Sequence, residues 1–198
     1  MSLSKKLRKT VRPKPQLKTR PEILLCPNIP SPMHGVTPRS ILGPKWWNET
    51  RKAAYKSTAY RCLACGIYKF SAAFRQWLEG HELYKVDYKL GRLTYIETVP
   101  LCFCCHNYIH DGRLRAMLEH HEITDCRFVA IIQHGDRVLS AAGLSRLSFA
   151  ERRDELIEAG LQGEVAGWKK WRMVLKGKMY KPKFATPQQW EKAFLKRR

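Results

Sequence analysis

The sequence predicts an α+β fold built on a small core that a metal ion stabilises. Two C-x-x-C pairs, Cys62/Cys65 and Cys102/Cys105, are spaced so that they could close a single metal site. Between the pairs, residues 82–99 alternate polar and apolar side chains in the manner of a β-hairpin. Segments outside the pairs carry apolar residues at three- and four-residue spacing, which indicates helices. These patterns predict a hairpin and helices gathered around one zinc-binding unit.

The composition indicates a nucleic-acid partner. The 198 residues leave room for one ordinary domain with appendages. Lysine and arginine number 37 against 17 aspartates and glutamates, which gives a net charge of +20. Such an excess implies a polyanion, and DNA is the partner that we expect. A basic tail that only aids solubility is the alternative, but basic residues recur along the whole chain.

Cysteine usage and the lack of export signals point to a reducing compartment. The sequence has no run of about 18 apolar residues, so we expect no membrane span. The basic N-terminus lacks the apolar core of a signal peptide. In such a chain, C-x-x-C pairs indicate metal-binding thiols rather than disulfides. We therefore expect a cytoplasmic protein in which Cys26, Cys104 and Cys126 are free thiols or small apolar side chains.

The first region, residues 1–44, is predicted to be an extended basic arm followed by a strap. The arm is rich in proline and cannot bury enough apolar surface to fold alone. We expect it to lie along phosphates, although a nuclear-targeting signal has a similar composition. Residues 23–44 combine apolar residues with prolines and are predicted to be ordered and extended. The basic residues expected to bind nucleic acid here are Lys5, Lys6, Arg8, Lys9, Arg12 and Lys14.

The second region, residues 45–125, is predicted to hold the zinc-binding unit. A helix over 45–58 places Trp46 and Trp47 on the face toward that unit, with base stacking as an alternative role. The hairpin should turn at 89–92, where Gly91 suits the positive φ of a tight turn. A helix is expected from Cys105 through His110, and another over 113–122. Arg113 and Arg115 are further candidates for nucleic-acid binding.

The third region, residues 126–198, is predicted to be a hairpin followed by a basic and mostly helical segment. Apolar residues at 128–133 and 138–139 flank a turn-like stretch at 134–137. Ser148 and Glu151 form a capping-box pattern for a helix that ends near residue 160. Residues 165–174 and 186–194 are also predicted to be helical.

The four paired cysteines carry the strongest chemical signal in the chain. Zinc takes four thiolates tetrahedrally, and two short knuckles deliver them with little chain strain. We therefore expect Cys62, Cys65, Cys102 and Cys105 to bind one structural zinc ion, with Cys104 outside the site. A structural zinc says nothing by itself about catalysis, so a plain zinc-finger binding module fits this signal equally well.

The stretch around these cysteines resembles the HNH endonuclease family, including its small phage-encoded members. The resemblance covers residues 60–111, where His81 precedes the expected hairpin and the knuckle C-x-x-C-H opens a helix. It implies a treble-clef ββα-metal fold. Two positions depart from the family pattern. Gly80 stands where many members have a metal-binding residue, and Glu97 or Thr98 stands where they have an asparagine.

The resemblance also implies a catalytic arrangement. His106 and His110 are four residues apart and share one helical face, where they could hold a divalent cation such as Mg²⁺. His81 would be the general base that deprotonates the attacking water. Glu82, or alternatively Glu79, is a candidate to replace the ligand that is missing at Gly80.

Two functional hypotheses follow. In the first, the chain is a metal-dependent HNH-type endonuclease that cleaves phosphodiester bonds in DNA. In the second, it is an HNH-like zinc module that has lost catalysis and binds nucleic acid or a nucleoprotein assembly. A cavity shared by His81, His106 and His110 would favour the first hypothesis.

Overall fold

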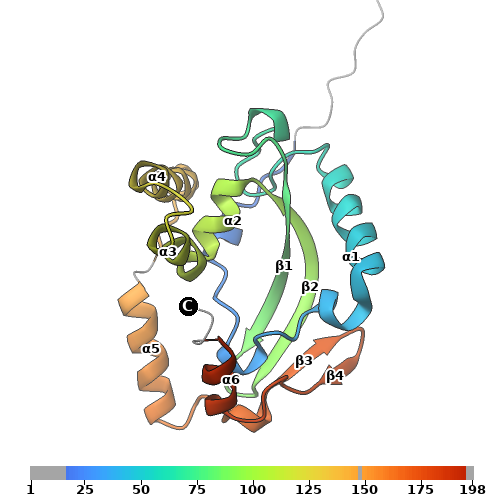
Figure 1. Cartoon of the computed structure of the whole chain (residues 1–198), viewed down its shortest axis with the longest axis vertical. Coiled ribbons are helices and arrows are strands. Elements are labelled where there is room, and N and C mark those ends of the chain that lie inside the picture. The colour runs from blue at the N-terminus through green and yellow to red at the C-terminus, as the bar shows by residue number, and fades with distance from the viewer. Residues whose placement is uncertain (1–16, 147–148, 195–198) are drawn as a thin grey trace, which may run out of the picture.

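The computed structural model describes residues 17–146 and 149–194, and this part of the chain has the predicted α+β class (Figure 1). Its six α-helices are α1 (Pro38–Ser57), α2 (Phe103–Ile109), α3 (Asp111–Glu119), α4 (Asp125–Ala141), α5 (Phe149–Leu161) and α6 (Pro187–Phe194). Its four strands are β1 (Glu79–Asp87), β2 (Arg92–Leu101), β3 (Arg172–Leu175) and β4 (Lys178–Tyr180). Short 3₁₀-helices cover Pro21–Leu25, Ser31–Met33, Lys69–Ser71 and Trp168–Lys170.

The strands form one mixed sheet in the order β1-β2-β3-β4. The predicted hairpin is confirmed as β1 and β2, which pair antiparallel and turn at Gly91 with a φ of 64°. β1 begins earlier than expected, so His81 lies within the strand and pairs with Val99. β3 joins β2 in parallel, and β4 pairs antiparallel with β3. The C-terminal strands therefore complete the sheet that the hairpin of residues 79–101 begins.

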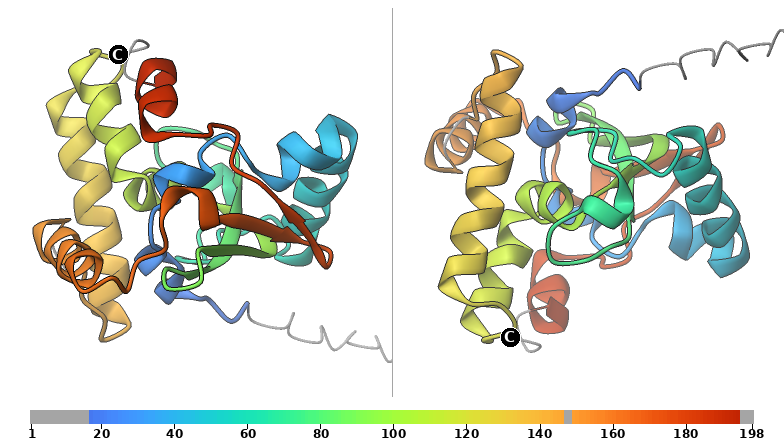
Figure 2. Two further views of the ribbon diagram at one scale, coloured as in Figure 1. Left: turned by 90° about the horizontal axis from the view of Figure 1, so that it is seen from below. Right: turned by 90° about the horizontal axis from the view of Figure 1, so that it is seen from above.

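Helices lie on both sides of the hairpin. α1 packs along β1 and β2 on one side, while α2, α3 and α4 lie on the other (Figures 1 and 2). Because side chains alternate along a strand, neighbouring residues of β1 face different helices. This alternation decides which residues of β1 reach α2.

The N-terminal strap contains more helix than its prolines predicted. Two 3₁₀-helices occupy part of residues 21–33, and α1 begins at Pro38 rather than at residue 45. Proline is well suited to the first helical turn, where its missing N–H has no partner to lose. Thr37 and Ser40 cap this start reciprocally, and Gly43 breaks the helix with a φ of 83°. The basic residues between Lys5 and Lys14 lie outside the described residues.

The hairpin predicted over residues 128–139 is wrong, because this segment is part of α4. The side chain of Thr124 caps the helix by accepting a hydrogen bond from the Arg127 amide over 3.3 Å. The stretch predicted to turn lies in the middle of the helix, where Gly135 packs directly on the ring of Tyr108 in α2. A β-carbon at Gly135 would lie 2.1 Å from that ring. Glycine is therefore needed for close approach of two helices, and not for a turn.

The helix predicted over residues 165–174 is also wrong. This segment forms one turn of 3₁₀-helix and then β3. Trp171 is buried, and its indole N–H donates to the carbonyl of Ala166 over 3.1 Å. Lys176 and Gly177 both have positive φ, at 50° and 73°, as a tight two-residue turn between β3 and β4 requires. The C-terminal region is thus mostly helical, as predicted, but its hairpin is formed by β3 and β4 and not by residues 128–139.

Other helix predictions agree with the structure. The final helix appears as α6, and the break expected near Asp111 separates α2 from α3. The helix expected from residue 148 appears as α5, although its predicted cap, Ser148, lies outside the described residues. No helix in the described ranges combines the length and apolar content needed to cross a bilayer.

We predict that Gly135→Ala destabilises the protein, because the added methyl group would overlap the buried ring of Tyr108. The free energy of unfolding should fall by about 1–3 kcal/mol, measured by chemical denaturation. Gly160→Ala in α5 is the matched control, since nothing lies within 4 Å of a β-carbon there. That control should be neutral or gain about 0.5–1 kcal/mol. Equal losses in both variants would contradict the close contact between α2 and α4.

Candidate metal centres

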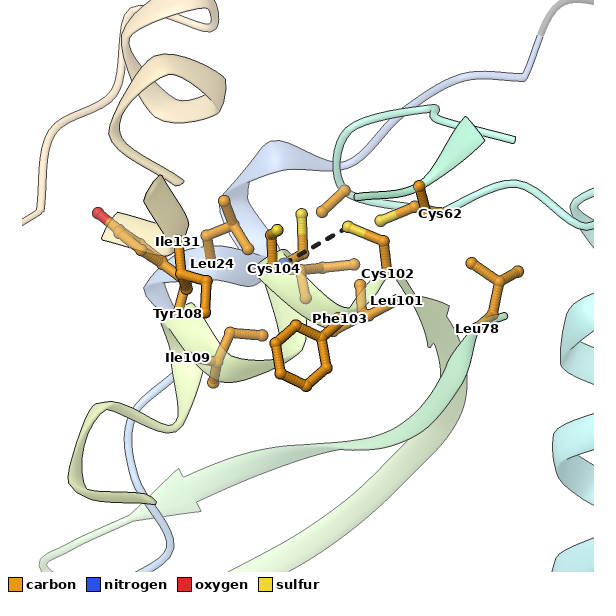
Figure 3. Close-up of a cluster of buried hydrophobic side chains, with 14 of the residues drawn as sticks. Leu24, Cys62, Leu78, Leu101, Cys102, Phe103, Cys104, Tyr108, Ile109 and Ile131 are labelled. Carbon is orange, nitrogen blue, oxygen red and sulfur yellow. Dashed lines mark hydrogen bonds between the residues drawn. The ribbon is translucent and has the colours of Figure 1, made fainter. Parts of the chain in front are cut away.

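Four cysteine sulfur atoms meet where the hairpin joins α2. Cys62 and Cys65 come from the knuckle after α1, Cys102 caps α2, and Cys105 lies in its first turn. All four sulfur atoms lie within 4.8 Å of one another. In Figure 3 the sulfur atoms of Cys62 and Cys102 lie next to each other. The structure therefore brings the four predicted ligands together.

The spacing and chemistry of this cluster fit zinc. A tetrahedral ion with Zn–S bonds of about 2.3 Å holds its sulfur ligands about 3.8 Å apart. The sulfur atoms of Cys65 and Cys102 are 3.8 Å apart. Hydrogen bonds with Cys102, Cys62 and Cys65 raise the pKa of the Cys105 thiol well above its ordinary range. Four thiolates this close need a cation between them, which makes the cluster a possible structural zinc site.

Cys104 is not part of the cluster, although it stands between two of its members in the sequence. It is buried in the hydrophobic core, and this burial raises the pKa of its thiol to about 11. A buried neutral thiol behaves as a small apolar side chain.

A histidine that the sequence did not single out contacts the cysteine cluster. His134 of α4 places its Nε2 3.4 Å from Cys105 Sγ and 3.9 Å from Cys102 Sγ. An imidazole N–H that donates to a thiolate holds that ligand in place and reduces its charge. In the sequence His134 lies in a turn-like stretch, but the helical spacing of Phe128, Ile131 and Val138 is a signal that places it on a helix.

Three histidines form a second cluster between β1 and α2. His81 lies on β1, His106 on α2, and His110 between α2 and α3. The nitrogen atoms that could bind a metal lie within 4.8 Å of one another. His81 Nδ1 and His110 Nε2 are 3.2 Å apart. Two nitrogen ligands of a tetrahedral ion, bound at about 2.0–2.1 Å, would be about 3.3 Å apart. We call this group the histidine centre.

Burial keeps two of these imidazoles in the neutral form that binds a metal, and it also weakens both as proton acceptors. Burial lowers the pKa of His81 to about 2, and the charges of His110 and His106 act in the same direction. Burial likewise lowers the pKa of His110 to about 3, helped by the charges of His106 and Arg113. The lone pairs of both imidazoles are therefore available at neutral pH.

Glu79 supports the histidine centre from β1. It lies two residues before His81, and therefore on the same strand face. The Nδ1–H group of His106 donates to the Glu79 carboxylate, and Arg75 Nη1 lies 3.3 Å from its other oxygen. Burial would raise the pKa of Glu79, but the His106 hydrogen bond and nearby positive charges lower it overall. The carboxylate orients His106 and leaves its Nε2 free for a metal.

Gly80, where the family pattern has a ligand, faces away from the histidine centre. A β-carbon at Gly80 would lie 3.0 Å from the Trp47 ring and 3.2 Å from Arg51 Cβ, both on α1. Any side chain at this position would therefore meet α1 and not a metal held by α2. The acidic residue that supports the centre is Glu79 instead.

Glu82, the other candidate ligand, is not part of the clustered ligands. Its Oε1 is buried without a hydrogen-bond partner among the described residues and lies 3.9 Å from Arg39 Nε. Burial raises the pKa of its carboxyl group. Glu82, Tyr84, His81 and His110 all border a cavity of about 30 Å³. This space suits one water molecule, which could satisfy the buried oxygen atoms of Glu82 and Tyr84.

The residues at the family's asparagine position take other partners. Glu97 pairs with Arg20 over 2.5 Å, and the Thr98 hydroxyl is 2.9 Å from the Tyr95 hydroxyl. Of the predicted nucleic-acid contacts, Arg113 and Arg115 are exposed on α3. Arg113 lies close enough to the histidine centre for its charge to act on His110.

Comparisons with protein-family models, with curated proteins and with solved structures found no match to this chain. The geometry of the two clusters therefore carries the functional argument. Of the residues in that geometry, Arg75 and His134 were missed from the sequence. Arg75 gave no signal there, because its ion pair depends on how the loop before β1 folds.

We predict that Cys105→Ser abolishes tight zinc binding while Cys104→Ala retains it. A ligand loss opens the tetrahedral site, whereas Cys104 lies outside it. Metal analysis of the purified proteins should give about one zinc per chain for wild type and Cys104→Ala. If Cys104→Ala lost zinc and Cys105→Ser retained it, Cys104 and not Cys105 would be the ligand, and this assignment would be refuted.

We also predict that His134→Ala weakens zinc binding by roughly 10- to 100-fold, the cost of removing an outer partner of a metal ligand. Competition with a chromogenic chelator measures this change. His120→Ala is the control, because His120 is exposed at the end of α3 and contacts neither cluster. Unchanged zinc affinity in His134→Ala would show that the N–H···S contacts do not support the site.

Proposed function

We propose that this chain is a metal-dependent endonuclease of the HNH type that cleaves DNA. The observation that carries the proposal is the histidine centre, in which β1 and α2 bring His81, His106 and His110 within 4.8 Å of one another. The order of hairpin, knuckle and helix around this centre supports the proposal, because the sequence resembles a family with a ββα-metal fold. The cysteine cluster fixes the start of α2 and therefore supports the centre from one side.

In this proposal, His106 and His110 hold a divalent cation. When bound, such a cation stabilises negative charge on the scissile phosphate and the leaving oxygen. Glu79 orients His106 through its Nδ1–H, so that the opposite ring nitrogen faces the centre. His110 is neutral because it is buried, and it can bind through its Nε2.

His81 would accept the proton of the attacking water. Its imidazole is neutral near pH 7, so a lone pair is free, but burial lowers its pKa to about 2 and makes it a weak proton acceptor as it stands in this structure. The same geometry supports a second role, in which His81 is a third ligand of the cation, because its Nδ1 lies 3.2 Å from His110 Nε2. These two roles predict different behaviour when His81 is replaced.

Positive charge around the centre supports a phosphate substrate. Arg75 lies on one side through its contact with Glu79, and Arg113 lies near His110. Both could contact the phosphates that flank a cleavage position. The net charge of +20 would supply sequence-independent attraction to DNA.

The alternative is a zinc module that binds nucleic acid without cutting it. His81 is only 6% exposed, which favours this alternative because a general base must reach the attacking water. The cysteine cluster and the basic surface would serve such a module without any catalytic cation. Cleavage assays with Mg²⁺, Mn²⁺, Ni²⁺ and Zn²⁺ separate the two functions.

We predict that His81→Ala lowers the cleavage rate by roughly 10²- to 10⁴-fold, the usual contribution of a general base. Its affinity for Mn²⁺, measured by calorimetry, should stay near wild type, whereas His110→Ala should lose that affinity. His120→Ala serves as the exposed control. Loss of Mn²⁺ affinity in His81→Ala would assign it as a ligand. A wild-type protein that binds DNA but cleaves nothing with any of the four cations would leave the binding module as the function.

A further inference from the structure

The exposed aromatic side chains of the described residues gather in one segment before β1. This segment, residues 60–77, is called the aromatic loop below. Its exposed rings are Tyr60, Tyr68, Phe70, Phe74 and Trp77. Phe70 is 57% exposed, Trp77 52% and Phe74 46%. Large rings left open to water along one segment indicate a surface that another molecule covers.

Cationic side chains lie over these rings. Lys69 Nζ is 4.6 Å from the ring centre of Tyr60 and 4.5 Å from that of Phe70. The Arg75 guanidinium is 5.2 Å from the Trp77 ring. Arg127 of α4 lies 4.5 Å from the Phe74 ring and Arg61 lies 5.7 Å from the Tyr68 ring. Aromatic rings interleaved with positive charge are the combination that binds bases and phosphates of a single strand.

The backbone of the loop is held in an unusual conformation. Phe74 and Tyr60 have positive φ values of 68° and 59°, a region that bulky residues rarely adopt. Phe74 also contacts the buried Phe103 at a ring distance of 6.2 Å, so the core fixes one side of it. The loop therefore presents its rings from a fixed position and not from a free tip.

The aromatic loop lies beside the histidine centre. Arg75 contacts both Trp77 and Glu79, and Glu79 contacts His106. On the other side, the Arg20 amide donates to the Leu63 carbonyl over 2.8 Å. This bond attaches the chain that follows the basic residues 5–14 next to the loop. Both the proposed cleavage site and the start of the described chain therefore contact residues of the aromatic loop.

We propose that the aromatic loop binds an unpaired DNA strand, whose bases stack on Phe70, Phe74 and Trp77 while its phosphates contact Lys69 and Arg75. Bases in an intact duplex are stacked on each other and cannot stack on these rings. The inference rests on the proposed function in one respect, because it makes DNA with a single-stranded segment the substrate of the histidine centre. A gapped duplex or a duplex with an overhang would offer unpaired bases to the aromatic loop and a phosphodiester bond to the histidine centre.

The first experiment measures binding alone, by fluorescence anisotropy at one salt concentration, with oligo(dT) and with a blunt duplex as probes. Phe70→Leu and Trp77→Leu keep apolar bulk but remove the ring. Each should weaken oligo(dT) binding by roughly 5- to 150-fold, the range for one stacked base. Duplex binding should change less than threefold. Phe74 is left intact because it touches the core.

Leu90→Ala is the matched control, since Leu90 is 54% exposed at the far end of the hairpin. Its oligo(dT) binding should equal that of wild type. Zinc content and thermal stability of all variants show whether the fold is retained. Wild-type affinity for oligo(dT) in the folded Phe70→Leu, Trp77→Leu double variant would overturn the inference.

The second experiment separates this inference from the proposed function. Cleavage is compared on a gapped duplex and on an intact duplex of the same sequence. In one outcome, the protein cleaves both duplexes equally and the double variant is fully active. That result would support the endonuclease proposal and refute strand binding by the aromatic loop. If the double variant loses oligo(dT) binding but the wild type cleaves neither duplex, strand binding by the aromatic loop is supported and the endonuclease proposal fails.

Discussion

The cysteine cluster is the constraint on which the arrangement of this molecule depends. α2 covers only Phe103–Ile109, and an isolated helix of that length is not stable in water. Cys102 caps this helix and Cys105 lies in its first turn, so a bound metal would fix both its start and its direction. The same metal would also bind Cys62 and Cys65 of the first knuckle, and so would fix the chain between α1 and the hairpin. His106 and His110 take their positions from this short helix.

Local patterns predicted the parts of the fold that depend on neighbours in the sequence. The cysteine spacing, the hairpin with Gly91 and the final helix all follow from such patterns. α4 was missed because its β-branched and aromatic residues favour a strand, while packing against α2 decided for a helix. β3 was missed because its partner, β2, lies far away in the sequence, and a parallel pair leaves no hairpin signal.

The same distinction applies to the candidate site. The four cysteine positions followed from their C-x-x-C spacing. His81, His106 and His110 followed from family resemblance and helical spacing. Of the side chains around them, Glu79 was only an alternative to Glu82 as a ligand. Arg75 and His134 were not predicted, because their contacts depend on tertiary packing. Side chains alternate along β1, so Glu79 faces α2 and reaches His106. Gly80 faces α1, where a side chain would meet that helix and could not bind a metal at the histidine centre. His134 reaches the cysteines only because α4 is a helix that crosses α2.

The parallel pair of β2 and β3 also sets the order in which the chain can fold during synthesis. Arg92 pairs with Arg172, so the ribosome must complete α3, α4 and α5 before the partner strand exists. Until then, the outer edge of β2 presents unpaired backbone groups to other chains. The knuckles and the hairpin are complete much earlier, so a metal held by the four cysteines would bind while this edge is still open. A chain that stops before residue 172 would hold its metal ligands yet carry an edge suited to aggregation.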